Sequence, residues 1–451
     1  MLIHSKLFSS CSRPWGKIKK PCGLPLRCNA LYSSYYHYRD KGGYLVSAYW
    51  LTDVRLETGR VSEDGWERTQ TALFHLKIAD GQIEAILAAG QETPQDGLEL
   101  RSAQQALALP AFIEKHVHLD KTFLGGGWRP TRPVGSILER VALEVELLKQ
   151  HPLPTEERAS KFLDVILAAG STHVRTHIDI APAYGLSHLE AVQGVLQAYH
   201  EKLSYEIVAF PQHGLLRTRS QKLVREAMRQ GATLVGGVDP ATVDNDIERS
   251  LGEMMEIAVE FKAGIDLHLH DQGPAGLATI QHLADLTAEA GWQGRVAISH
   301  AFALADLDRG ELENLALRLA ELQIAIVSSV PYRVRPPLPR LRAQNVPVAL
   351  GCDNVYDSWS SFGNGDILER LNRLAQLEGW GDEASLSRSL GLITGGKTPL
   401  NDAGEQVWPQ VGDSADLVLL DASCSAEAIA RRAKRLTVLH RGRLIAGTLN
   451  T

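Results

Sequence analysis

The chain has 451 residues, of which 44% are hydrophobic and 22% charged, as expected for a soluble globular protein with one large domain and a smaller one. Its formal net charge of −6 argues against a nucleic-acid-binding surface, and no apolar run approaches the length of a membrane-spanning helix. The five cysteines include no Cys-x-x-Cys pair, so neither a disulfide framework nor a zinc knuckle is expected, and the cytoplasm is the expected location.

The first 43 residues differ in composition from the rest of the chain. They combine many lysines and arginines with a single acidic residue, Asp40, which is the charge pattern of a targeting peptide. They lack a continuous apolar segment, however, and Pro14, Pro21 and Pro25 interrupt any amphipathic helix. We therefore expect residues 1–43 to form a poorly ordered basic extension.

Both ends of the remaining chain show the pattern of short strands joined by turns. Residues 72–87 read as a β-hairpin whose tight turn is Asp80-Gly81. Residues 415–447 again predict strands separated by turns. We expect residues 44–108 and 405–451 to build one small β-sandwich domain together.

Residues 109–404 alternate between strand and helix, which favours a TIM-like (β/α)8 barrel. An open doubly wound sheet is the alternative, but no Gly-x-Gly-x-x-Gly follows the first strand. Helical patterns such as Glu156–Ala169 and Pro274–Ala290 separate most strands, although the seventh connection, 332–345, is short and rich in proline. The eight predicted strands are Leu109–His116, Thr172–Ile180, Tyr205–Pro211, Thr233–Asp239, Gly264–His270, Arg295–Ala301, Ile324–Pro331 and Val346–Cys352.

The first barrel strand ends in His116-Val-His118, followed closely by Asp120. Side chains two positions apart on a strand point to the same face, so the two imidazoles project together. Two imidazoles beside an acidic group make half of a divalent metal site. Taken alone, the pair also fits two ordinary histidines near the end of a buried strand.

Further polar residues follow the later strands. In a (β/α)8 barrel the C-terminal strand ends form the active site, so these side chains are expected to converge there. Twelve of the 16 histidines fall between residues 116 and 300, a concentration that favours one shared site. The strand-end groups are His177-Ile-Asp179, Gln212-His213, His268-Leu-His270-Asp271, Ser299-His300 and Cys352-Asp353-Asn354.

These motifs resemble the amidohydrolase superfamily, and within it the cytosine deaminase branch. The matching segments are 116–120, 174–177, 207–212, 299–300 and 352–359, and the likeness extends over residues 44–450. The resemblance implies one divalent metal ion, Zn²⁺ or Fe²⁺, held by His116, His118, His268 and Asp353. It also implies that His300 orients and deprotonates the metal-bound water, that Gln212 contacts the substrate ring, and that Asp271 shuttles the proton.

The expected reaction is hydrolysis. A divalent ion held by imidazoles and a carboxylate lowers the pKa of bound water towards about 7, and the hydroxide attacks a ring carbon that bears an exocyclic nitrogen. The departing nitrogen then needs a proton from a carboxyl group such as that of Asp271. Asn354 and Trp359, like Gln212, lie in or just after strand-end motifs and are expected to line the substrate pocket. Asp271 also fits a simple helix N-cap before Pro274.

Four features depart from the cytosine deaminase pattern. Asp271 stands where that branch has Glu, Cys352 where it has His, and Asn354 where it has an acidic residue. The glycine-rich segment Lys121–Trp128 is the fourth, and it predicts either a mobile lid or a simple turn. The expected substrate is therefore a small nitrogen heterocycle: a cytosine-like pyrimidine, an aminotriazine or a related cyclic amidine.

Other enzyme classes fit less well. No Lys ends the third or fourth strand, where two-metal members of the superfamily carry a bridging lysine, so one metal is expected. The His-x-Glu and Pro-Cys-x-x-Cys signature of nucleic-acid deaminases is missing. The sequence thus predicts a hydrolytic deaminase that releases ammonia, without nucleic-acid or membrane partners and as a homo-oligomer. The alternatives are an amidohydrolase that cleaves a substituted amine or cyclic amide, and a catalytically silent metal-binding scaffold.

Overall fold

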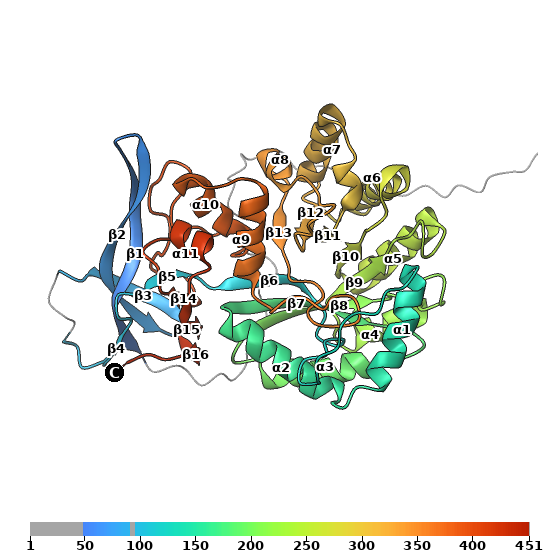
Figure 1. Ribbon diagram of the computed structural model, residues 1–451, viewed down its shortest axis with the longest axis horizontal. Helices are drawn as coiled ribbons and strands as arrows, with labels where there is room; N and C mark the ends of the chain where they lie inside the picture. The colour runs from blue at the N-terminus through green and yellow to red at the C-terminus, as the bar shows by residue number, and fades with distance from the viewer. Residues whose placement is uncertain (1–47, 91–94, 451) are drawn as a thin grey trace, which may run out of the picture. The chain divides into compact units, whose positions relative to one another are not determined.

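The computed structural model describes residues 48–90 and 95–450. The predicted extension, residues 1–43, lies outside the described residues. Within the described ranges the chain forms two eight-stranded sheets and the helices that pack on them (Figure 1). None of the helices in this part of the chain is both long enough and apolar enough to cross a lipid bilayer.

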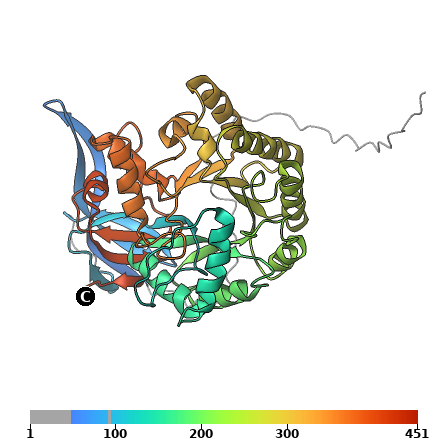
Figure 2. The same cartoon turned by 45° about the vertical axis from the view of Figure 1, so that its right-hand side comes forward.

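The larger sheet is the predicted barrel. Its eight strands pair in parallel, each with its neighbour in the sequence, and Figure 2 shows the helices arranged around them. The strands agree closely with the eight predicted segments, and the (β/α)8 architecture is confirmed. They are β6 (Phe112–Val117), β7 (Ser171–Asp179), β8 (Ser204–Phe210), β9 (Leu234–Val238), β10 (Gly264–His268), β11 (Val296–Ser299), β12 (Ala325–Ser328) and β13 (Val348–Leu350).

The helices follow ordinary capping rules. Asp308 caps the N-terminus of α7 in a capping box with Glu311, and Gly291 ends α6 in the left-handed conformation. The proline-rich seventh connection holds one short helix, α8. The helices are α1 (Ile137–Lys149), α2 (Thr155–Ala168), α3 (Ser187–Ala198), α4 (Gln221–Arg229), α5 (Ile247–Phe261), α6 (Gly273–Ala290), α7 (Arg309–Glu321), α8 (Leu338–Ala343), α9 (Ile367–Leu377), α10 (Glu383–Ser389) and α11 (Ser425–Arg431), with 3-10 turns η1 (Phe302–Ala305) and η2 (Leu390–Leu392).

The second sheet combines strands from both ends of the chain, as predicted. Its order is β16-β15-β14-β5-β1-β2-β3, with β4 paired to β1. The predicted hairpin is present: β2 and β3 pair up to Ala79 and Gln82, and Asp80 and Gly81 between them both have positive φ. The strands are β1 (Tyr49–Glu63), β2 (Trp66–Ala79), β3 (Gln82–Ala88), β4 (Glu99–Ser102), β5 (Leu107–Pro110), β14 (Leu417–Leu420), β15 (Arg435–His440) and β16 (Arg443–Gly447).

One predicted strand is divided between the two sheets. The apolar run from Leu107 to Ile113 reads as continuous in the sequence, but Leu107–Pro110 is β5, which pairs with β14, whereas the barrel strand β6 begins at Phe112. Only Ala111 separates them. An apolar run reports burial and not the sheet in which a strand is buried, so the boundary could not be placed from the pattern.

The barrel closes where β13 meets β6. The backbone N–H of Asp353 donates to the carbonyl of His116 at 2.6 Å, and the carboxylate of Glu114 accepts the N–H groups of His116 and Cys352. A Cβ at Gly351 would lie 2.4 Å from the Cβ of His116, so only glycine allows the two strands to approach this closely. The closing seam therefore carries two of the predicted metal ligands.

Candidate active site

The four predicted metal ligands lie together at the C-terminal strand ends. His116 is in β6, His118 follows that strand, His268 ends β10, and Asp353 follows β13. The Nε2 atoms of His116 and His118 each lie 3.4 Å from Asp353 Oδ1. His268 Nε2 lies 3.5 Å from His118 Nε2. All three imidazoles are buried.

This donor set fits a divalent ion. Two atoms bound to one tetrahedral ion at about 2.0–2.1 Å lie roughly 3.4 Å apart, which is the spacing found here between His116, His118 and Asp353. The buried Nε2 of His116 has no hydrogen-bond partner, as expected for an atom reserved for a metal. Three groups that could hold an ion occur among the described residues, and His116 belongs to all of them: one with His118 and Asp353, one with His268 and His300, and one with His177 and Asp266.

A hydrogen-bonded chain behind His116 sets the orientation of its ring. Ser299 Oγ donates to Asp266 Oδ1 at 2.7 Å, and Arg175 binds the other oxygen of Asp266. Because the Ser299 proton is used in this way, its oxygen accepts from Nδ1–H of His116, 2.8 Å away. The other ring nitrogen, Nε2, then carries no proton and faces Asp353 ready to bind a metal.

The protonation states suit metal binding. Burial lowers the pKa of His118 to about 4 and that of His268 well below its ordinary value, so both imidazoles are neutral. Burial acts to raise the pKa of Asp353, but the neighbouring His300, His116 and His118 hold it well below the usual range. The site therefore presents neutral imidazoles and an ionised carboxylate, the forms that ligate metals.

His300 lies at the end of β11 beside this cluster. Its Nε2 is buried without a hydrogen-bond partner and lies 4.0 Å from Asp353 Oδ2. His300 and Asp353 have φ angles of 72° and 60°, a left-handed conformation that is uncommon outside glycine. Such backbone strain is found where a fold holds a side chain in a fixed functional direction.

Asp271 and His270 follow β10 and differ in their surroundings. Asp271 Oδ1 accepts a hydrogen bond from Thr242 at 2.7 Å, while Oδ2 is buried without a partner, and burial raises the pKa of this carboxyl. His270 lines the cavity at the metal ligands, and its ring stacks on His300 with centroids 4.4 Å apart. Burial opposes the charged form of His270, but the carboxylate of Asp239, 2.8 Å from Nδ1, raises its pKa.

The three predicted substrate-binding residues all line this cavity, whose volume is about 410 Å³. The Gln212 amide donates to Glu144 at 2.8 Å and accepts from Lys121 at 2.6 Å. Asn354 Nδ2 donates to Asp357 at 2.7 Å. The Gln212 oxygen already accepts from Lys121 and keeps one lone pair for a ligand, whereas Asn354 still offers its oxygen and one N–H.

Sequence reasoning missed a buried charged cluster behind Gln212. Lys121 is fully buried and lies 2.9 Å from Asp179 and 3.5 Å from Glu144. Glu144, on α1, also accepts the indole N–H of Trp359 and the hydroxyl of Ser358. The one signal in the sequence was the position of Lys121, directly after the first barrel strand. A lone lysine in a sequence is ordinarily read as exposed.

The glycine-rich segment after Lys121 forms turns. Gly125 has a φ of 87°, which suits glycine, and a Cβ there would meet Leu153 and Lys161 at 2.6 Å. Trp128 is 73% exposed and stacks on Tyr356, which in turn donates a hydrogen bond to the carbonyl of Gly127. The Trp128 ring does not line the cavity at the metal ligands.

Comparison with known proteins identifies the family of this chain. The sequence pattern of the amidohydrolase family matches residues 145–446. The chain is 44% identical over 406 residues to the uncharacterized protein YahJ of Escherichia coli (strain K12), which covers 89% of this chain and 88% of that protein.

Two solved structures are similar over most of their length. The N-isopropylammelide isopropylaminohydrolase from Burkholderia multivorans ATCC 17616 superposes with a TM-score of 0.78 at 30% identity, covering 89% of this chain and 99% of that one. The 5-methylcytosine deaminase from Klebsiella pneumoniae gives a TM-score of 0.72 at 26% identity, with 88% and 97% covered. By sequence and fold the chain belongs to the amidohydrolase family and is a hydrolase of carbon–nitrogen bonds.

Proposed function

We propose that this enzyme removes an amino group from a small nitrogen heterocycle by hydrolysis. The observation that carries the proposal is the cluster of His116, His118, His268 and Asp353, of which the last three line a cavity, with nearest ligand atoms 3.4–3.5 Å apart. When bound there, one divalent ion, Zn²⁺ or Fe²⁺, supplies Lewis acidity that lowers the pKa of a water molecule.

The protein's own side chains then have two proton-transfer tasks. His300 accepts a proton from the attacking water, since its Nε2 is buried, has no partner and lies 4.0 Å from Asp353. A carbon–oxygen bond forms at the amino-bearing ring carbon. The carbon–nitrogen bond breaks once the nitrogen has received a proton, and ammonia leaves, so that the ring carbon carries an oxo group in place of the amine.

Two side chains are candidates for protonating the leaving nitrogen. Asp271 has a raised pKa and an unpartnered oxygen, which suits a proton donor. His270 lines the cavity directly, and its Nδ1 is held by Asp239 so that Nε2 is directed away from that carboxylate. Asp271 is the predicted proton shuttle, and His270 is the alternative. Substituting each residue separately distinguishes the two.

The pocket favours a ring that carries N–H groups. Gln212 and Asn354 both offer carbonyl oxygens, and the indole of Trp359 is held by Glu144 at the cavity wall. A cavity of about 410 Å³ accommodates a single heterocycle or a fused pair of rings. The two structural relatives are named for isopropylammelide and 5-methylcytosine, which are both nitrogen heterocycles.

A second candidate reaction is cleavage of a substituted amine from such a ring. It is supported by the similarity to the isopropylaminohydrolase, at 30% identity over 89% of this chain. A catalytically silent scaffold is the remaining alternative, and it is disfavoured because all four ligand positions hold competent residues.

The test is a substrate panel assayed on protein purified without chelators and analysed for bound metal. Aminopyrimidines, aminotriazines and their N-alkyl derivatives are incubated with the enzyme, and ammonia and alkylamine are measured separately. Ammonia from an unsubstituted amino ring supports the deaminase, whereas alkylamine alone supports the second candidate. Metal-loaded protein that releases neither amine across the panel would contradict both.

A further inference from the structure

Two arginines line the same cavity as the proposed metal ligands. Arg370 and Arg373 lie one turn apart on α9, and both border the space that His118, His268 and Asp353 also line. Arg370 is only 7% exposed, and the Arg373 side chain is 16% exposed. Neither the proposed metal ligands nor the proposed ring-binding residues require a positive charge on this wall.

Arg370 has little to balance its charge. Its Nη2 donates to the backbone carbonyl of Cys352 at 3.0 Å, and no carboxylate of the described residues lies within ion-pair distance of it. The nearby Asp366, which caps α9, pairs with Arg435 instead. A single bond to a neutral carbonyl leaves most of the five N–H donors of the guanidinium without a protein acceptor.

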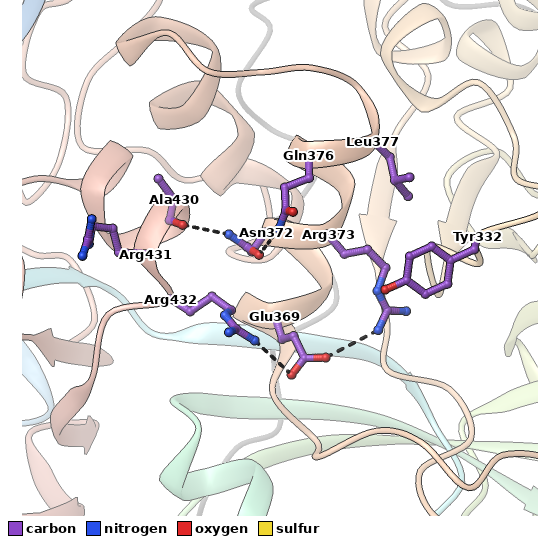
Figure 3. A pocket seen from close by; sticks show the side chains of 9 residues that line it. All are labelled: Tyr332, Glu369, Asn372, Arg373, Gln376, Leu377, Ala430, Arg431 and Arg432. Carbon is purple, nitrogen blue, oxygen red and sulfur yellow. Dashed lines mark hydrogen bonds and ion pairs between the residues drawn. The ribbon is translucent and has the colours of Figure 1, made fainter.

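Arg373 is only partly neutralised. Its carboxylate partner is Glu369 at 3.4 Å, and Figure 3 shows Glu369 between Arg373 and Arg432, which lies 3.8 Å from the same carboxylate. One negative charge is therefore shared by two arginines. Burial lowers the pKa of Arg373, and the like charge of Arg370 lowers it further.

A structural role does not account for this arrangement. The bond from Arg370 to Cys352 tethers α9 to the end of β13, but a neutral donor would serve equally well. The guanidinium groups of Arg370 and Arg373 repel each other, and the only carboxylate paired with either among the described residues is Glu369, which Arg373 shares with Arg432. Buried charge without a partner is costly to folding. Such an arrangement is typical of a site that receives an anion, because guanidinium groups bind carboxylates and similar planar oxyanions with paired hydrogen bonds.

We propose that the substrate carries a negatively charged oxygen group, bound by Arg370 and Arg373 while the amino-bearing carbon faces the histidine cluster. This inference rests on the proposed function and narrows its substrate class to anionic amino heterocycles. The charge can come from a carboxylate substituent or from an ionised ring oxygen, and both present the same chemistry to the arginines.

Matched substrate pairs test the inference and separate these sources. The first pair is cytosine and its 5-carboxylate, and the second is pterin and its 6-carboxylate. The third is an amino-oxo-triazine and the same ring with a second, more acidic oxo group. We expect the anionic member of at least one pair to have a kcat/KM about 10-fold higher or more, the scale of one charge-assisted hydrogen bond. Neutral members that react as well as or better than the anionic ones would overturn this inference and leave the proposed deaminase intact. Metal-loaded enzyme inactive on every compound would overturn the proposed function itself.

Substitutions then assign the effect to the arginines. Arg370→Met should raise KM for the preferred anionic substrate about 10-fold or more, with kcat and the neutral member changed far less. Arg432→Met is the matched control, because Arg432 shares Glu369 but does not line this cavity. Arg373→Met tests the same prediction if Arg370→Met does not fold. Bound metal is measured in every variant. Equal losses on charged and neutral substrates in the folded variants would assign the arginines a structural role and overturn the proposal.

Discussion

The backbone N–H of Asp353 and the carbonyl of His116 are joined by a hydrogen bond of 2.6 Å, so two proposed metal ligands meet across the seam that closes the barrel. The first and last barrel strands are far apart in the sequence, and their contact is completed at the site itself. The parallel bridge between Val117 and Asp353 is part of the same seam. The contact that closes the barrel therefore also brings two of the four proposed ligands together.

His268→Ala should abolish both bound metal and turnover, because it removes one of the four proposed ligands and the remaining three cannot complete a tetrahedron. Metal content by elemental analysis and the rate of amine release are measured on the same preparation. His200→Ala is the control, since His200 is exposed on the surface. Full metal occupancy in His268→Ala would remove this ligand assignment.

Ser299→Ala should weaken metal binding by about 10- to 100-fold, the usual effect of losing a group that orients a ligating histidine. Ser299 fixes Nδ1 of His116, so its loss frees the ring to rotate and to change its protonated nitrogen. Competition with a chelator of known affinity measures the change. Ser328→Ala is a matched control, because that buried serine ends β12 and its hydroxyl accepts only the N–H of Val330. Equal affinities in the two variants would argue against the role of Ser299.

Asp271→Asn should retain metal and substrate binding and lose roughly 100-fold or more in kcat if Asp271 protonates the leaving nitrogen. His270→Asn gives the same result if His270 does so instead. Single-turnover rates with the same substrate and metal load decide between them. If neither substitution lowers kcat by more than a few-fold, the proton comes from another group, and His213 is the next to examine.

Gln212→Ala should raise KM or lower kcat/KM while metal stays bound, because Gln212 lines the cavity and is proposed to bind the ring, while its hydrogen bonds go to Lys121, Glu144 and Asp179 and not to the proposed metal ligands. Loss of one neutral hydrogen bond predicts a change of about 10-fold. Gln193→Ala, on the surface of α3, is the control, and its kinetics should match the wild type. An unchanged kcat/KM in Gln212→Ala would place the ring elsewhere in the cavity.

Asp357, a buried residue near the site, makes the stability of the fold depend on pH. Burial, and then the charge of Glu144, raises its pKa from 3.8 to about 7. The folded state holds this proton more tightly than the unfolded chain, so the contribution to stability is complete below about pH 4 and is lost as pH rises to about 7. Asp357→Asn should remove this pH-dependent contribution to the free energy of unfolding, which is at most about 4 kcal/mol.

The measurement for Asp357 is the unfolding free energy, or Tm, of variant and wild type across pH 4 to 8. The difference between the two curves is expected to change with pH mainly within that window. The Asp402 side chain is 85% exposed, so the pH dependence of unfolding in Asp402→Asn should match that of the wild type. A constant offset between Asp357→Asn and wild type would contradict the raised pKa.

The sequence predicted the barrel because its signals are local. Each strand is a short apolar run, and polar residues such as Asp353 follow directly where the strand ends. The hairpin around Gly81 was found for the same reason, since a tight turn has its own residue preferences. The division between β5 and β6 was missed because burial in either sheet gives the same apolar pattern.

Contacts between side chains on different strands and helices could not be predicted in this way. Lys121 is buried only because Asp179, from β7, and Glu144, from α1, meet it in space. Likewise, Asp239 supports His270 because β9 and β10 are neighbours in the barrel. Pairings of this kind depend on tertiary distances, which spacing along the chain does not contain.

The position of β5 has a consequence for how the enzyme is made. This strand pairs with β14, near the end of the chain, and only Ala111 separates it from β6, which carries His116. While the ribosome is still synthesising the barrel helices, β5 has no partner on that side. Its edge is paired only when residues Leu417–Leu420 have emerged. We therefore expect the strand that begins the metal site to be anchored late in synthesis, and nascent chains that stop before Leu417 to expose an apolar sheet edge to chaperones.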